Sequence, residues 1–265
     1  MGFKKKQFGQ HFLADKAIIS SIIEAARLEP SDNVVEIGPG AGALTPHIAE
    51  CVRSLVAIEI DKTLIPGLEK GVSSFSNVKI VNGDALKFDF SSLENPVKVV
   101  SNLPYNISTP ITFKLLHQEA RISDMVLMYQ KEVGERLTAT PGGKSYGSLS
   151  VITQFYRDAT LLFHVDRRSF SPPPGVDSCV VRLAQRKQRP VFVKDEAFFF
   201  SVVKASFSHR RKTLKNSLSS ASSLRPFLKR AFARSGVEPG CRAETLTLSD
   251  FASLANVLKE ESSSG

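Results

Sequence analysis

One stretch of the sequence constrains the fold more than any other, the segment VVEIGPGAGALT at positions 34–45. A β-branched apolar run leads into Gly38, Gly40 and Gly42, and a helical pattern follows them. Glycine permits positive φ and close approach of the backbone, so such a turn can hold a nucleoside-like ligand at the start of a helix. A tight strand-to-helix turn without a ligand is the alternative interpretation.

The rest of the first half alternates short β-branched runs with helical patterns. This alternation is typical of a mostly parallel sheet covered by helices. Strands are expected at 33–37, 54–60, 78–82, 97–101, 124–129, 159–164 and 178–183, and helices at 15–27, 43–51, 62–70, 110–117, 131–138 and 148–156. The sequence therefore predicts an α/β, Rossmann-like domain over residues 1–185 with a seven-stranded, mostly parallel sheet.

A second, small all-α domain is expected over residues 186–265. The segment 184–196 is polar, basic and interrupted by Pro190, which marks a boundary. Beyond it the pattern is helical, at 197–207, 224–235 and 249–259. This part carries 15 Lys and Arg against 7 Asp and Glu, whereas residues 1–185 carry 20 against 19. Such an excess suits a phosphate-rich partner, although a solvated basic face without a ligand would give the same composition.

Two acidic residues are expected at the same sheet edge as the glycine turn. Glu59 ends the second strand, where a carboxylate can accept both hydroxyls of a ribose, and Asp84 follows the third strand. NAD and S-adenosylmethionine (SAM) both fit a turn of this kind. The third glycine comes one position too early for the NAD fingerprint GxGxxG, and Glu36 completes the methyltransferase pattern ExGxGxG, so SAM is the cofactor favoured by the spacing.

The fourth strand runs into the sequence NLPY, Asn102, Leu103, Pro104 and Tyr105, which resembles the [DNS]PPY signature of methyltransferases acting on the amino group of adenine. An aryl amine is a poor nucleophile because its lone pair is delocalised into the ring. The Asn102 side-chain oxygen and the Leu103 or Pro104 carbonyl can accept its two N–H bonds, which stabilises the transition state through oriented dipoles. Tyr105 can stack on an extruded base. No Asp, Glu or His is assigned as a general base.

Other features exclude several classes of protein. Cys51, Cys179 and Cys241 are far apart and lack CxxC spacing, and the five histidines show no ligand spacing, so no metal site is expected. No apolar run reaches the length of a membrane span, and the N-terminus lacks the apolar core of a secretory signal. A cytoplasmic protein without a membrane partner is therefore expected.

Over nearly its full length the chain resembles the KsgA-type ribosomal RNA adenine dimethyltransferases. The resemblance is carried by FGQHFL at 8–13, EIGPGAGALT at 36–45, IEID at 58–61, GDAL at 83–86, NLPYNIS at 102–108, FSPPPGVDS at 170–178 and KASFSHRRKTLKNSL at 204–218. It implies that His11 and Leu13 close over SAM beside Gly38, Gly40, Glu59, Asp84 and Asn102. It also implies that Phe170 sandwiches the target base opposite Tyr105. His11 stands where the motif often has Asn.

The resemblance further implies a substrate, small-subunit (16S) ribosomal RNA within a partly assembled 30S particle, dimethylated at two adjacent adenosines near its 3′ end. Three alternatives remain: a large-subunit enzyme of the antibiotic-resistance type, a non-catalytic ribosome-assembly factor, and an NAD-dependent oxidoreductase, which the glycine spacing disfavours. The oligomeric state stays open. If the chain is helical from His209, Arg211, Lys212 and Lys215 share one face, and with Arg210 they form the expected RNA contact, unless this is only a solvated helix face.

Overall fold

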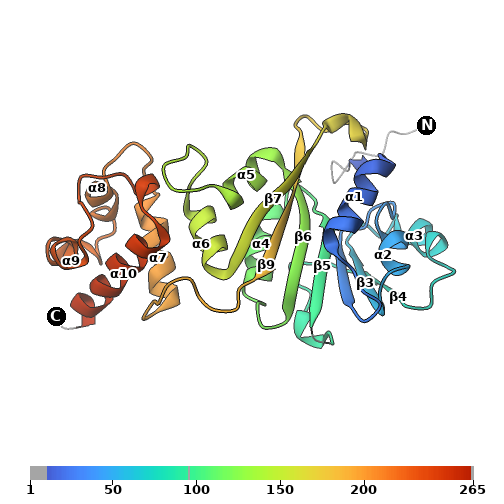
Figure 1. Cartoon of the computed structure of the whole chain (residues 1–265), viewed down its shortest axis with the longest axis horizontal. Helices are drawn as coiled ribbons and strands as arrows, with labels where there is room; N and C mark the ends of the chain where they lie inside the picture. Colours follow the sequence, from blue (N-terminus) through green and yellow to red (C-terminus); the bar gives the residue numbers. More distant parts are fainter. Residues whose placement is uncertain (1–10, 95, 264–265) are drawn as a thin grey trace. The chain divides into compact units, whose positions relative to one another are not determined.

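The structure is a computed structural model that describes residues 11–94 and 96–263. The chain divides into two units (Figure 1). The first comprises the residues up to Gly134 together with Arg157–Gln185, and the second comprises Glu135–Tyr156 and the residues from Arg186 onward. The expected domain boundary after residue 185 coincides with one of these divisions, but residues 135–156 belong to the second unit rather than to the first.

The first unit is built on a seven-stranded sheet with the order β4-β3-β2-β5-β6-β9-β7. Strands β4 to β6 in this order are parallel, and β9 runs antiparallel to both of its neighbours. The strands are β2 (Asn33–Ile37), β3 (Ser54–Glu59), β4 (Val78–Asn82), β5 (Val97–Asn102), β6 (Ile122–Gln130), β7 (Arg157–Val165) and β9 (Ser178–Gln185). The predicted seven-stranded, mostly parallel sheet is confirmed, as is the helical C-terminal region.

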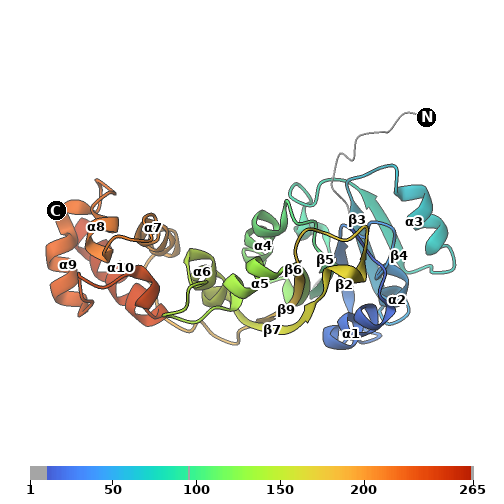
Figure 2. The same cartoon turned by 90° about the horizontal axis from the view of Figure 1, so that it is seen from above.

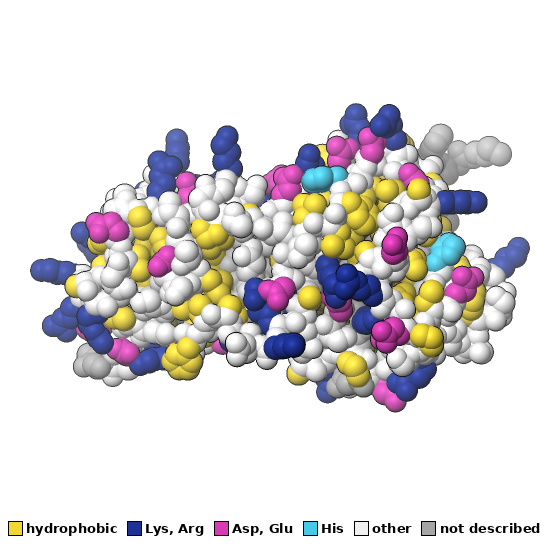
Figure 3. Space-filling model, viewed as in Figure 1, with side chains coloured by type: hydrophobic (Ala, Val, Ile, Leu, Met, Phe, Trp, Pro, Cys, Tyr) yellow, Lys and Arg dark blue, Asp and Glu magenta, His cyan; other side chains and the backbone are white. Residues whose placement is uncertain are grey.

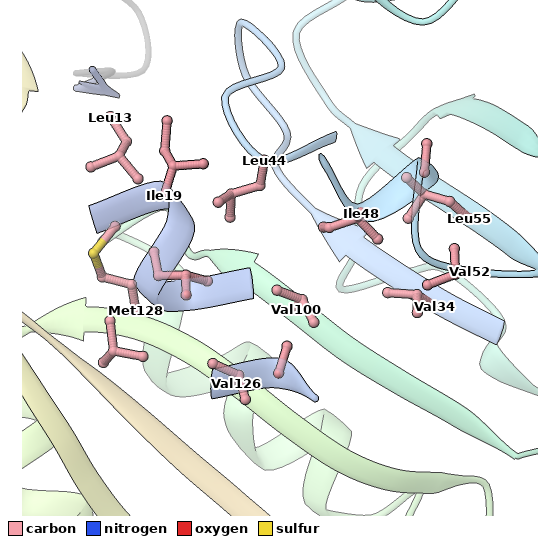
Figure 4. Close-up of a cluster of buried hydrophobic side chains, with 14 of the residues drawn as sticks. Leu13, Ile19, Val34, Leu44, Ile48, Val52, Leu55, Val100, Val126 and Met128 are labelled. Carbon is pink, nitrogen blue, oxygen red and sulfur yellow. The ribbon is translucent and has the colours of Figure 1, made fainter. Parts of the chain in front are cut away.

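Helices cover both faces of this sheet (Figure 2). Helices α1 (Lys16–Ala26) and α2 (Thr45–Ala49) lie on one face and α4 (Ser108–Leu116) on the other, while α3 (Ile65–Gly71) lies near the β4 edge. Side chains of α1 and α2 meet alternate residues of the central strands. Figure 4 shows Ile19 and Ile48 pointing toward a layer of strand residues, Val34, Val100, Val126 and Met128, all of them buried. Removing these surfaces from water is the main source of stability.

A two-stranded sheet forms beside the main one. It pairs β1 (Phe12–Leu13) antiparallel with β8 (Phe170–Ser171), so that Phe12 faces Ser171 and Leu13 faces Phe170. Strands of two residues leave no periodic pattern, and the sequence did not predict this pairing. The pairing ties the described start of the chain to a loop more than 150 positions away.

The second unit is helical. It contains part of α5 (Lys131–Thr138), α6 (Ser148–Tyr156), α7 (Glu196–Ser206), α8 (Leu214–Leu218), α9 (Leu228–Ser235) and α10 (Leu248–Ser263). Helix α6 belongs here because Phe155 packs against Phe199 and Phe200 of α7, with ring centroids 5.2 and 5.4 Å apart. Short 3-10 turns occur in the chain at Phe90–Ser92, Arg167–Ser169, Arg225–Phe227 and Ala243–Thr245. Within the described residues, no helix is both long enough and apolar enough to cross a membrane.

The expected helix starting at His209 is not present. Helix α7 ends at Ser206, and residues 209–213 form a turn in which the Lys212 N–H donates to the His209 carbonyl. Thr213 has an extended backbone and caps α8, its hydroxyl accepting from the Asn216 N–H at 3.4 Å. Arg211 and Lys212 therefore lie on an exposed turn, so the condition under which they would share one helical face with Lys215 is not met.

Candidate functional site

A cavity of about 370 Å³ opens at the carboxyl edge of the sheet. Its walls come from five segments, 11–13, 36–44 except residue 42, 58–60, 83–85 and 102–107. Each of the last four begins within one residue of the end of a parallel strand. The order of the strands reverses between the neighbours β2 and β5. Ligands of open α/β sheets bind at such a switch point.

The glycine turn and the NLPY motif touch at the floor of this cavity. Gly38 has φ of +66°, and a Cβ placed on it would lie 2.9 Å from Cγ of Pro104. Gly40 has φ of +59°, and its Cβ would lie 3.1 Å from the Phe12 ring. The Ser101 hydroxyl donates to the Ile37 carbonyl and joins the ends of β5 and β2. Glycine is favoured at both turn positions, because a side chain there would have a strained backbone and would crowd Pro104 from position 38 or Phe12 from position 40.

The carboxylate of Glu59 is held rigidly in the wall. It is 3% exposed, Oε2 accepts from the Gly40 N–H at 3.0 Å and Oε1 accepts from the Asp61 N–H at 2.8 Å. The next strand end is attached to it, since the Gly83 N–H and the Asn82 side chain both donate to the Glu59 carbonyl, at 2.9 and 2.8 Å. Each carboxylate oxygen keeps acceptor capacity for a ligand hydroxyl.

Asp84 lies in the adjoining wall. Its Oδ1 accepts from the Leu86 N–H at 2.9 Å, and its carbonyl accepts from the N–H groups of Lys87 and Phe88. Asp84 is thus a turn residue and a cavity residue at once. Gly83 and Ala85 beside it also line the cavity.

The four residues of NLPY all line the cavity. Among the described residues the Asn102 side-chain amide makes no hydrogen bond, so its oxygen and nitrogen are available to a substrate. The Pro104 carbonyl accepts from the Ile107 N–H at 3.1 Å, whereas no such bond to the Leu103 carbonyl is present in the same part of the chain. The Tyr105 hydroxyl lies 2.6 Å from the Ser178 hydroxyl, and burial raises the pKa of Tyr105.

The N-terminal motif is only partly described, because Phe8, Gly9 and Gln10 lie outside the described residues. His11 lines the cavity, and its Nδ1 donates to the Pro172 carbonyl at 2.8 Å. Its ring lies over Tyr105 with centroids 6.4 Å apart. Leu13 also lines the cavity.

Phe170 is placed differently from the other expected residues. Its side chain is 3% exposed in the hydrophobic cluster under α1, and it is not among the residues that line the cavity. In this structure Phe170 packs as a core residue, and its expected contact with a substrate base stays a prediction.

Glu36 is the acidic group whose part in the wall the sequence did not reveal. It is 2% exposed, and within the described residues its Oε2 has no hydrogen-bond partner. Burial raises the pKa of Glu36 to about 8, reinforced by the Glu59 carboxylate and opposed by the Thr45 hydroxyl. From the sequence, Glu36 could be recognised only as the acidic residue of the ExGxGxG pattern, because the sequence does not show which side of the sheet a strand residue before a turn will face.

The charges around the cavity decide which nucleoside ligand fits. The carboxylates of Glu59 and Asp84 line it beside Glu36, which is neutral below its raised pKa of about 8, and the described lining residues include no Lys or Arg. The pyrophosphate of NAD would enter a negative cavity without a cation to neutralise it. A sulfonium ligand carries the complementary charge, and the glycine cradle admits close backbone contact, so the residues present fit SAM.

Comparison with known proteins places the chain in a family. The sequence model described as "Ribosomal RNA adenine dimethylase" matches residues 2–260. The chain belongs to the ribosomal RNA adenine dimethylase family. It is 45% identical to "Ribosomal RNA small subunit methyltransferase A" of Streptococcus thermophilus, over 97% of this chain and 92% of that protein. The relative of the same name from a Geobacillus species is also 45% identical, over 96% of this chain and 91% of its own length.

Solved structures of similar fold include other members of this group of enzymes. A dimethyladenosine transferase from Plasmodium falciparum superposes with a TM-score of 0.78 at 29% identity, covering 92% of this chain and 96% of its own. The 23S rRNA methyltransferase ErmE superposes with a TM-score of 0.72 at 28% identity, covering 94% of this chain and 99% of its own. The fold of this chain therefore occurs both in a structure named a dimethyladenosine transferase and in one named a 23S rRNA methyltransferase.

The high pKa of Glu36 predicts a pH-dependent stability. Because the folded-state pKa of about 8 exceeds the unfolded value of 4.5, the neutral acid favours the fold, and this contribution is lost as the pH rises from about 4.5 to 8. In Glu36→Gln this loss is absent. We therefore expect the unfolding free energy of the variant, relative to that of the wild type, to be higher at pH 8.5 than at pH 5 by on the order of 3 kcal/mol.

Urea unfolding at both pH values measures this difference, with Glu94→Gln, at an exposed side chain, as the control. A difference between Glu36→Gln and wild type that is the same at pH 5 and 8.5 would show that Glu36 does not titrate in this range.

Proposed function

We propose that this dimethylase uses SAM to dimethylate the N6 amine of two adjacent adenosines near the 3′ end of small-subunit ribosomal RNA, during assembly of the 30S particle in the cytoplasm. The observation that carries the proposal is the Asn102 amide, which no other described residue hydrogen bonds, beside an acidic cavity lined by Gly38 and Gly40. Support also comes from the small-subunit relatives at 45% identity.

The cofactor would be held by the walls already described. Glu59 would accept from the ribose hydroxyls, Asp84 would face the nucleoside, and the Gly38 and Gly40 backbone would pass along the cofactor. His11 and Leu13 would cover it from the β1 side. When bound there, SAM supplies an electrophilic methyl group on a positively charged sulfur.

The chain's own residues activate the nucleophile. The Asn102 side-chain oxygen and the Leu103 carbonyl would accept the two N–H bonds of the adenine amine, which draws its lone pair out of the ring. The Pro104 carbonyl is already hydrogen bonded to the Ile107 N–H, which makes Leu103 the better acceptor of the two expected. Tyr105, fixed by its bond to Ser178, would present a ring face to the base. The amine proton can leave to solvent after transfer.

The large-subunit alternative is weaker but rests on a real similarity, the superposition on ErmE at 28% identity. The small-subunit relatives are more similar in sequence and match almost the whole chain, including the C-terminal region. A purely non-catalytic assembly factor would have no need of an Asn102 amide at the cavity that makes no hydrogen bond within residues 11–94 and 96–263.

The direct test measures methyl transfer from labelled SAM to small-subunit particles from a strain lacking this methylation, with large-subunit RNA as the competing substrate. We expect dimethyladenosine in the small-subunit RNA, and we expect Asn102→Ala to slow single-turnover transfer about 100-fold with RNA affinity nearly unchanged. Ser76→Ala, at an exposed position just before β4 and outside the residues that line the cavity, is the control. Methylation of large-subunit RNA alone would overturn the substrate assignment, and near-wild-type rates in Asn102→Ala would remove Asn102 from the chemistry.

We infer that the second unit, with residues 186 onward at its centre, binds the RNA backbone. Figure 3 shows Lys and Arg side chains projecting from this helical unit. Several of its cations lie within 4 Å of a carboxylate, namely Arg189, Lys194, Arg230, Arg234, Arg242 and Lys259. Arg211, Lys212 and Lys215 are exposed and have no such partner among the described residues. Arg210 is also exposed, but its guanidinium donates to the Lys144 carbonyl at 2.7 Å.

The exposed turn predicts a salt-dependent contact. Reversing Arg211 and Lys212 to Glu should weaken binding to small-subunit particles and lower the slope of log affinity against log salt by roughly 0.7 to 0.9 per lost phosphate contact. Arg225→Glu with Lys229→Glu makes the same charge change at exposed positions elsewhere in the unit. An unchanged slope, or an equal change in the control pair, would show that the turn makes no specific phosphate contact. SAM affinity should be unchanged in both.

A further inference from the structure

A lysine outside the cavity holds the turn that carries Asp84. Lys114 lies on α4, the helix that follows NLPY, and its ammonium donates to the carbonyls of Ala85, Leu86 and Phe88 at 3.1, 2.8 and 2.5 Å. All three protons of the ammonium are therefore used on one short turn. The group also lies 5.2 Å from the centre of the Phe90 ring.

The polar groups of the turn are satisfied by two residues. Asp84 accepts the N–H groups of Leu86, Lys87 and Phe88 through its side chain and its carbonyl. Lys114 supplies donors to the carbonyls on the other side. Burial lowers the pKa of Lys114, while the carboxylates of Asp84 and Asp89 raise it. Without Lys114, three carbonyls would need water or a different backbone path.

This arrangement connects the two halves of the proposed site. Gly83, Asp84 and Ala85 line the cavity on one side, and Asn102–Ile107 line it on the other. The Lys114 side chain connects the two segments. Its helix, α4, begins directly after Ile107, and its ammonium donates hydrogen bonds to the turn that follows Asp84. A shift of the turn would move Asp84 away from a nucleoside bound in the cavity.

We propose that Lys114 is a positioning residue for the nucleoside end of the cofactor, which it orients by fixing the Asp84 turn to α4. The proposal rests on the proposed function, in that the cavity binds SAM. It assigns Lys114 no contact with the cofactor or the base. Its loss should therefore weaken cofactor binding much more than it slows the methyl transfer of the saturated enzyme.

The test compares Lys114→Met with Lys98→Met. Lys98 makes a similar set of bonds, to the Arg27 carbonyl and to Asp32 at 2.7 Å each, but it lies near the start of β5, at the opposite edge of the sheet from the cavity. We expect Lys114→Met to raise the dissociation constants of S-adenosylhomocysteine and of 5′-methylthioadenosine by a similar factor of about ten, because the lost order is at the shared nucleoside end. The kcat at saturating SAM should stay within about threefold, and Lys98→Met should match the wild type.

A second variant and a second measurement keep the test valid if Lys114→Met does not fold properly. Lys114→Gln keeps two donors and should lose about threefold in affinity. Hydrogen exchange of the amides in residues 83–90 should quicken in Lys114→Met but not in Lys98→Met. Wild-type affinity in Lys114→Met, an equal loss in Lys98→Met, or a lowered kcat with unchanged KM for SAM would each overturn the proposal. Failure of the wild type itself to bind S-adenosylhomocysteine would instead overturn the proposed function.

Discussion

The close approach of Gly38 to Pro104 is the constraint on which the site depends. The glycine turn after β2 and the NLPY turn after β5 meet without a side chain between them. A Cβ on Gly38 would lie only 2.9 Å from the Pro104 ring. The strand order creates this meeting, since β2 and β5 are neighbours at the point where the connections reverse. A cofactor on the first turn and a base on the second are thereby brought to one cavity.

The sheet could be predicted from the sequence because its strands leave strong patterns. The expected strands at 33–37 and 78–82 match β2 and β4 as observed. Glu59, the last residue of β3, and Asp84, just after β4, line one cavity because parallel strands end at one edge of the sheet. Weaker local signals misled. Where a helix was expected at 224–235, a 3-10 turn containing Pro226 precedes α9, and α8, which begins after the Thr213 cap, was not expected as a separate helix.

Contacts between distant segments could not be predicted from the sequence, since no local pattern encodes them. The pairing of Leu13 with Phe170, the bond from Lys114 to the Asp84 turn and the burial of Glu36 all depend on how the sheet brings segments together. The charged residues likewise indicate a function only once the structure shows where they lie. Three acids surround the cavity, whereas the cations without a carboxylate partner at 211–215 lie in the other unit, a division that suits a cationic cofactor and an anionic polymer bound by different parts of one chain.

Calorimetry of S-adenosylhomocysteine and NAD binding measures whether the acidic wall recognises the nucleoside of SAM. The wild type should bind the first and not the second. Glu59→Ala should lose on the order of 1–3 kcal/mol of binding free energy, because the ribose hydroxyls lose their acceptor, while Glu69→Ala, at an exposed position on α3, should bind normally. Equal affinity of wild type and Glu59→Ala, or tighter binding of NAD than of S-adenosylhomocysteine, would contradict the account.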